Sequence, residues 1–283
     1  MNRLLLAGKW LKALVLLAVM GGAQAHDSWF APMPSPAVGD VRLALGTGNA
    51  FPEQDSTVGD GALCANGCRH GLAAARELHI TRDAKEALHL RTNPPRMPGP
   101  QAPEAISCWA QMPNFELEVT ADKVPIYLDE INASPSLRAT WEAMRARGLP
   151  WRERYVKSAR YEWFDPHLRG KAQGQAMPAQ AAPLGLDIVL QGPLVQPRVG
   201  DTLRFVLLRD GQPLPELPLE LRHEKATQGV WMRSDAQGAV SARLLAAGRW
   251  LLRAVDLRLD PADADRWDSR FVTLSFSVGQ ARK

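Results

Sequence analysis

The chain has 283 residues, of which 46% are hydrophobic, 23% charged and 7% aromatic. This composition is typical of a folded protein of about two domains and excludes disordered, collagen-like and coiled-coil classes. Basic residues outnumber acidic ones by 34 to 30, but three of the basic residues, Arg3, Lys9 and Lys12, lie in a predicted leader, and without them the count is 31 to 30. Since no basic run remains, we expect no nucleic-acid partner.

The first 25 residues have the pattern of a secretory signal peptide. A basic start precedes an apolar run from Ala13 to Met20, and the sequence Ala23-Gln24-Ala25 provides a cleavage site. The apolar run is much shorter than the roughly twenty residues that a membrane-spanning helix needs. We therefore expect an exported, periplasmic protein that does not itself span the membrane. Cleavage after Ala25 would make His26 the first residue.

Residues 26–183 are predicted to form an N-terminal β-rich domain. Alternating segments at 77–81 and 87–91 indicate a β-hairpin, whereas the five prolines between Arg91 and Pro103 predict an irregular loop. A long strand is expected over residues 152–164, where aromatic residues recur with a period of two. The segment 170–183, rich in Gln, Ala, Gly and Pro, is predicted to connect two domains.

One helix is predicted within this domain, over residues 135–147. Ser134 provides an N-cap, and Pro135 occupies the first turn, where its missing N–H has no cost. Leu137, Trp141 and Met144 recur at helical spacing and predict one buried face.

Residues 184–283 are predicted to form a C-terminal immunoglobulin-like or transthyretin-like β-sandwich. Seven segments alternate between apolar and polar residues, and turn sequences such as Asp210-Gly211 separate them. The expected strands cover residues 187–191, 202–209, 217–223, 230–233, 239–244, 249–257 and 271–278. The fold class is therefore mainly β with two domains.

Three cysteines are present, and in an oxidising compartment a disulfide is expected of them. We favour a bond between Cys68 and Cys108, because Cys68 begins one strand-like segment and Cys108 ends the matching one. This leaves Cys64 as the spare thiol, with a role that the sequence does not indicate. A short bridge from Cys64 to Cys68 is the alternative.

Short motifs in a fixed order resemble a known family. They include Ala25-His26-Asp27-Ser28-Trp29-Phe30 at the cleavage site, Glu153-Arg154-Tyr155 with Lys157, and Leu184-Gly185-Leu186-Asp187-Ile188-Val189. A further pair is Ser234-Asp235-Ala236-Gln237-Gly238 and Gly248-Arg249-Trp250-Leu251-Leu252. The set resembles a secreted bacterial family of domains of unknown function that is often described as the periplasmic component of nickel/cobalt uptake systems. The resemblance implies a role in metal uptake.

His26 is the predicted metal ligand. As the first residue of the mature chain, it would offer both its α-amine and its imidazole, a chelating pair that suits Ni(II), Co(II) or Cu(II). His79 and His89 are weaker candidates. They lie on the polar side of the predicted hairpin and would pair directly across it if Asp83-Ala84-Lys85 formed the loop.

The predicted function is that of a non-enzymatic periplasmic protein that binds or delivers a divalent transition metal. Its expected partner is a membrane metal-uptake transporter or another envelope protein, and no catalytic residue is assigned. The alternative is an immunoglobulin-like envelope module that binds a protein or glycan partner. A copper oxygenase with an N-terminal histidine is a third possibility, which would need at least one more convergent histidine.

Overall fold

The computed structural model describes residues 26–34, 41–58, 63–71, 74–82, 88–91, 105–164, 176–177, 181–193 and 196–281. The fold is mainly β, as predicted, and the described residues form three sheets and two helices. The predicted signal peptide and nearly all of the proline-rich loop lie outside the described residues. Within the described part, no helix is long and apolar enough to cross a membrane.

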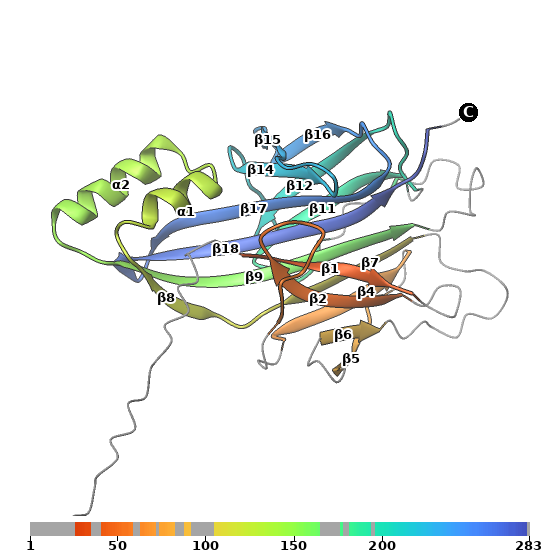
Figure 1. Ribbon diagram of the computed structural model, residues 1–283, viewed down its shortest axis with the longest axis horizontal. Coiled ribbons are helices and arrows are strands. Elements are labelled where there is room, and N and C mark those ends of the chain that lie inside the picture. Colours follow the sequence, from red (N-terminus) through yellow and green to blue (C-terminus); the bar gives the residue numbers. More distant parts are fainter. Residues whose placement is uncertain are drawn as a thin grey trace, which may run out of the picture.

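An eight-stranded sheet, here called the central sheet, joins the N-terminal and C-terminal parts of the chain. Its order is β15-β14-β17-β18-β9-β7-β4, and β8 also pairs with β9. Its strands are β4 (Ala65–His70), β7 (Ala105–Gln111), β8 (Phe115–Val119), β9 (Trp151–Phe164), β14 (Pro218–His223), β15 (Val230–Arg233), β17 (Gly248–Asp260) and β18 (Asp263–Val278). Figure 1 shows the three longest strands, β9, β17 and β18, running side by side.

The parallel pairing of β9 with β18 crosses the boundary predicted at residue 184. It runs from Glu153 opposite Trp267 to Glu162 opposite Phe276. The two predicted domains thus share one continuous sheet, and their division at this residue stays a prediction.

The C-terminal part is an immunoglobulin-like β-sandwich, as predicted. One of its sheets contains β10 (Ala176–Met177), β11 (Leu186–Pro193), β12 (Thr202–Arg209), β13 (Gln212–Pro213) and β16 (Ala239–Arg243). The other is formed by β15, β14, β17 and β18 of the central sheet. The chain crosses from one sheet to the other between β13 and β14, between β15 and β16, and between β16 and β17, as in Greek-key sandwiches. Buried apolar side chains from both sheets fill the space between them, with Ile188, Phe205, Leu252 and Leu274 at 0% exposure.

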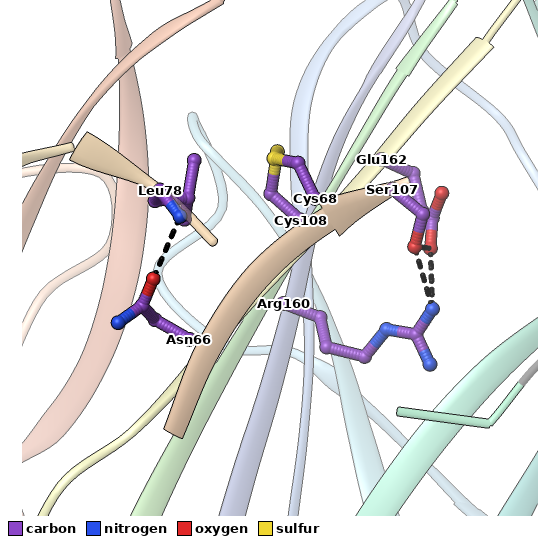
Figure 2. The surroundings of a disulfide bond; sticks show 7 residues. All are labelled: Asn66, Cys68, Leu78, Ser107, Cys108, Arg160 and Glu162. Carbon is purple, nitrogen blue, oxygen red and sulfur yellow. Dashed lines mark hydrogen bonds and ion pairs between the residues drawn. A yellow bond between two sulfur atoms is a disulfide. The ribbon is translucent and has the colours of Figure 1, made fainter. Parts of the chain in front are cut away.

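A second layer covers the N-terminal half of the central sheet. It contains β1 (Asp27–Met33), β2 (Arg42–Gly48), β3 (Ser56–Thr57), β5 (His79–Arg82) and β6 (Leu88–Arg91), in the order β1-β2-β6-β5 with β3 on β2. Leu43 and Leu90 of this layer pack with the disulfide between Cys68 and Cys108. The predicted disulfide is therefore confirmed, and it joins directly paired residues of β4 and β7 (Figure 2). Cys64 is an exposed free thiol.

Two helices, α1 (Val124–Glu130) and α2 (Pro135–Ala146), cover the other end of the central sheet (Figure 1). The predicted helix corresponds to α2, and Ser134 caps it by accepting a hydrogen bond from the N–H of Leu137. Trp141 and Met144 are buried, as predicted. Their neighbours include Trp151 and Trp267, whose stacked rings lie 4.6 Å apart.

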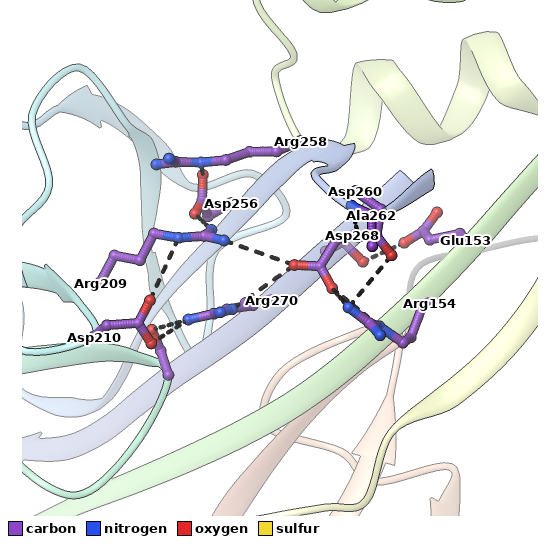
Figure 3. A network of polar contacts seen from close by, with 12 residues as sticks. Glu153, Arg154, Arg209, Asp210, Asp256, Arg258, Asp260, Ala262, Asp268 and Arg270 are labelled. Atoms are coloured by element: carbon purple, nitrogen blue, oxygen red, sulfur yellow. Dashed lines mark hydrogen bonds and ion pairs between the residues drawn. The ribbon is translucent and has the colours of Figure 1, made fainter. Parts of the chain in front are cut away.

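Strands β17 and β18 extend beyond the sandwich as a hairpin that the sequence analysis did not predict. Apolar side chains on one face of the extension contact the helices. Charged side chains on the other face form a network of ion pairs, in which Arg154 contacts both Asp260 and Asp268 (Figure 3). The alternation of apolar and charged residues allows the strands to continue where only one face is covered.

Candidate functional site

The candidate site lies on the face of the central sheet that the helices and the second layer share. Helices α1 and α2 cover Phe271 and the residues before it, whereas β1 crosses β18 at Thr273 and Ser275. Between the two coverings lie four charged side chains, which we call the seam: Asp27, Lys157, Glu220 and Arg253. His26 adjoins the seam at the beginning of β1.

Three hydrogen bonds fix β1 on the central sheet. The hydroxyl of Thr273 donates to the carbonyl oxygen of Ser28 at 2.6 Å, and that of Ser275 donates to the carbonyl oxygen of Phe30 at 2.9 Å. The Nζ of Lys157 donates to the carbonyl oxygen of His26 at 2.5 Å. The backbone at His26 is therefore held by the sheet beneath it, immediately after the predicted cleavage site.

Arg253, on β17, contacts four other elements, β1, β14, α1 and β15. Its Nη1 donates to the carboxylate of Asp27 at 3.0 Å, and its Nε donates to Glu220 at 2.5 Å. Its Nη2 donates to the carbonyl oxygen of Glu130 at 2.9 Å, at the end of α1. The guanidinium also lies 5.6 Å from the ring centre of Trp231 on β15. This single side chain thus joins β1, β14 and α1 to β17.

Burial and neighbouring charges shift the pKa values of three seam residues, Lys157, Arg253 and Glu220. Burial lowers the pKa of Lys157, and the charges of Asp27 and Glu153 oppose this change. Burial also acts to lower the pKa of Arg253, but Asp27 and Glu220 outweigh it and raise that pKa. For Glu220, burial acts to raise the pKa, but the charge and hydrogen bond of Arg253 hold it below the ordinary value. Arg253 and Glu220 therefore remain charged at neutral pH.

The predicted direct pairing of His79 with His89 is wrong. His89 pairs with Thr81, and His79 pairs with Arg91, so the two histidines are diagonal neighbours on the same face. Diagonal partners lie about 7–8 Å apart, farther than directly opposed residues. The pairing of β6 with β2 explains this register, because it places Leu90 opposite the core residue Leu43. Strand β5 ends at Arg82 and β6 begins at Leu88, and the predicted loop Asp83-Ala84-Lys85 lies outside the described residues.

The structure does not bring His26 together with these two histidines. His89 lies in the same row of the sheet as Ala44 and Ala31, whereas His26 precedes Ala31 by five residues. At about 3.3 Å per residue, this separation is about 16 Å along the strand. Among the described residues, no group of three or more His, Cys, Asp or Glu side chains is arranged to hold a metal ion.

Arg253 and Glu220 are the residues of the site that sequence reasoning missed. Each one interrupts an apolar run inside a predicted strand, in Leu251-Leu252-Arg253-Ala254-Val255 and Leu217-Pro218-Leu219-Glu220-Leu221. A charged residue in such a position needs a buried partner. That signal was present, but the sequence does not show which partner each charge has.

The comparisons with curated proteins and with solved structures give no information about function. No curated protein matches the chain. Among solved structures, the D0-D1 domain of Intimin covers 88% of this chain and 97% of its own length, with 9% sequence identity and a TM-score of 0.16. This degree of similarity carries no argument about function.

A family model provides the more informative match. Residues 169–256 match the family described as "Domain of unknown function (DUF4198)". The matched segment extends from before β10 into β17, and so covers most of the sandwich. It includes Glu220 and Arg253 of the seam but not His26, Asp27 or Lys157. The resemblance to a family of domains of unknown function is therefore confirmed over residues 169–256.

Proposed function

We propose that this chain is an exported, non-enzymatic periplasmic protein that binds a divalent Ni, Co or Cu ion through His26. The observation that carries the proposal is the hydrogen bond from Lys157 to the carbonyl oxygen of His26. It holds the backbone in place at the residue that cleavage after Ala25 would make the N-terminus. The resemblance to a family described in nickel and cobalt uptake supports the same assignment.

The donor set suits transient binding. The α-amine and imidazole of His26 would form a two-donor chelate, with nitrogen ligands that these metals favour. The nearest carboxylate in sequence, that of Asp27, is already bonded to Arg253. Water or a partner protein would then complete the coordination, and a partner with more donors could remove the ion. We accordingly propose a membrane metal-uptake transporter or another envelope protein as the recipient.

The first experiment determines the N-terminus of the protein purified from the periplasm. Sequencing should find His26 as the first residue. Calorimetric titration of this mature chain with Ni(II), Co(II) and Cu(II) then measures the affinity for each ion. A chain with one alanine added before His26 serves as the decisive variant, because it moves the amine away from the ring. We expect its affinity to fall by tenfold or more, about 1.4 kcal/mol.

A His79→Gln/His89→Gln double variant is the matched control, since it removes two histidines but leaves the N-terminus unchanged. The proposal predicts that this variant binds the metal ions with the same affinity as the mature chain. Equal affinities of the mature and alanine-extended chains would refute the chelate at His26. A loss confined to the double variant would transfer the site to the hairpin.

A further inference from the structure

Strand β17 is longer than the strand beside it. Its pairing with β14 ends where Ala254 lies opposite Leu219, but β17 continues to Asp260 and stays paired with β18 on its other edge. Within the described residues, no strand pairs with the β14 side of β17 from Val255 to Leu259. Alternate residues of this stretch direct their backbone N–H and C=O groups to the open edge. Pro218, the first residue of β14, is suited to ending a strand because it has no N–H to donate.

A pocket of about 230 Å³ lies at this open edge. One part of its lining comes from the connection between α1 and α2 and the first turn of α2, including Ser134 and Leu137. A second part comes from the loop before β14, including Leu214 and Pro215. The third is β17 itself, from Val255 to Arg258. Backbone hydrogen-bonding groups therefore adjoin a pocket with apolar side chains.

The charges around the pocket are unequal in accessibility. Asp256 is buried, and its carboxylate is bonded to both Arg209 and Arg258, as Figure 3 shows. The side chain of Arg258 is 47% exposed. Arg233 is also exposed, and it donates to the carbonyl oxygen of Glu216 at 2.6 Å. The charged residues that line the pocket thus include two accessible guanidinium groups, those of Arg233 and Arg258, and one accessible carboxylate, that of Glu216.

We propose that this pocket binds an extended segment of a partner protein, which adds as a strand to the open edge of β17 in line with β14. Backbone hydrogen bonds to Val255–Leu259 would supply the affinity, and side chains would supply the specificity. An apolar side chain of the segment would lie against Leu137 and Leu214, and an acidic one against Arg233 and Arg258. This site is separate from His26 and does not depend on metal binding.

A display library of short peptides with alternating apolar and acidic residues provides the probe. Selection on the full mature chain should enrich peptides that bind it in solution. Hydrogen exchange should then slow at the backbone amides on the open edge of Val255–Leu259 when the enriched peptide is added. The same peptide with alternate backbone nitrogens methylated should lose binding, because it can no longer donate hydrogen bonds to the strand.

Two variants test the side-chain contacts. Arg258→Glu should weaken peptide binding by about tenfold through charge reversal at the rim. Arg243→Glu is the matched control, since Arg243 is exposed on β16, away from the pocket. Pro215→Trp should prevent peptide binding, because the larger side chain would block the pocket while keeping the exposed loop apolar. The absence of any enriched peptide would overturn the proposal. Unchanged binding by the methylated peptide, or protection that spares β17, would do so as well.

Discussion

The Nη1 of Arg160 donates to both carboxylate oxygens of Asp187, at 2.8 and 2.9 Å. Arg160 lies on β9 and Asp187 near the start of β11, so the ion pair spans the predicted domain boundary. Both residues are 1% exposed. Arg160 also donates to the buried carboxylate of Glu162 and to the hydroxyl of Ser107, beside the disulfide (Figure 2). One cation thus serves two buried carboxylates where the two parts of the chain meet.

Arg160→Met should be strongly destabilising, because it leaves two carboxylates buried without their cation. We expect the free energy of unfolding to fall by about 3–5 kcal/mol at neutral pH. Burial already raises the pKa of Glu162, and the charge of Arg160 opposes this rise, so its loss would raise the pKa further. A raised carboxyl pKa costs stability as the pH rises through it. Urea denaturation should therefore show a smaller deficit at acidic pH.

Arg243→Met is the control for this experiment, since Arg243 is exposed. Its effect should remain within about 0.5 kcal/mol. Equal losses for the two variants would mean that the buried carboxylates do not depend on Arg160.

Local patterns predicted much of the fold. The seven C-terminal strands follow alternation with a period of two, and α2 follows from its Ser134 cap and its apolar stripe. The disulfide partner of Cys68 was inferred from the strand ends near Cys108. For the strands and the helix, the determining information lies within a few residues of the element that it predicts.

What the sequence did not reveal depends on contacts between distant segments. The parallel pairing of β9 with β18 joins residues more than a hundred positions apart, and no local pattern indicates it. The register of His79 is set by the core contact of Leu90 on the far edge of β6. Helix α1 is too short for a clear periodicity, and its burial comes from packing against the β17–β18 hairpin. Tertiary context decides such features.

The Cys68–Cys108 disulfide should contribute substantially to stability. The two cysteines are 40 residues apart in sequence, and closing a loop of this length is worth about 4 kcal/mol in the chain-entropy model. The double variant Cys68→Ala/Cys108→Ala should lose an amount of that order in denaturant titrations. Cys64→Ala, which removes the exposed thiol, should change the free energy of unfolding little. A similar loss in both variants would contradict the assignment of Cys64 as the spare cysteine.

Trp141 should anchor α2 to strand β9 of the central sheet. Its ring is 1% exposed and lies 5.3 Å from that of Trp151. Trp141→Ala would remove a large buried side chain, and we expect a loss of about 3–5 kcal/mol in the free energy of unfolding. Ile126→Ala is the control, since Ile126 of α1 is 47% exposed. If chemical denaturation gave equal losses for the two variants, the helices would not depend on this contact.

Glu153, in the same region, makes a pH-dependent contribution to the free energy of unfolding. Its carboxylate is buried and accepts hydrogen bonds from the hydroxyl of Tyr127 and the indole Nε1 of Trp151, at 2.9 and 2.8 Å. Ser269 also donates to it. Burial raises the pKa of Glu153 above the ordinary value of 4.5, although these three hydrogen bonds oppose the rise.

The raised pKa means that the folded state holds its proton more tightly than the unfolded state does. The contribution of Glu153 to stability should therefore be fully present below pH 4.5 and be lost as the pH rises through the raised pKa. Glu153→Gln removes this titration. The wild type should therefore become less stable relative to the variant as the pH rises. Urea denaturation across this range measures the difference, with Glu118→Gln, at an exposed position of β8, as the control. A difference that is constant with pH, or one that moves towards the wild type as the pH rises, would show that burial does not govern this carboxyl group.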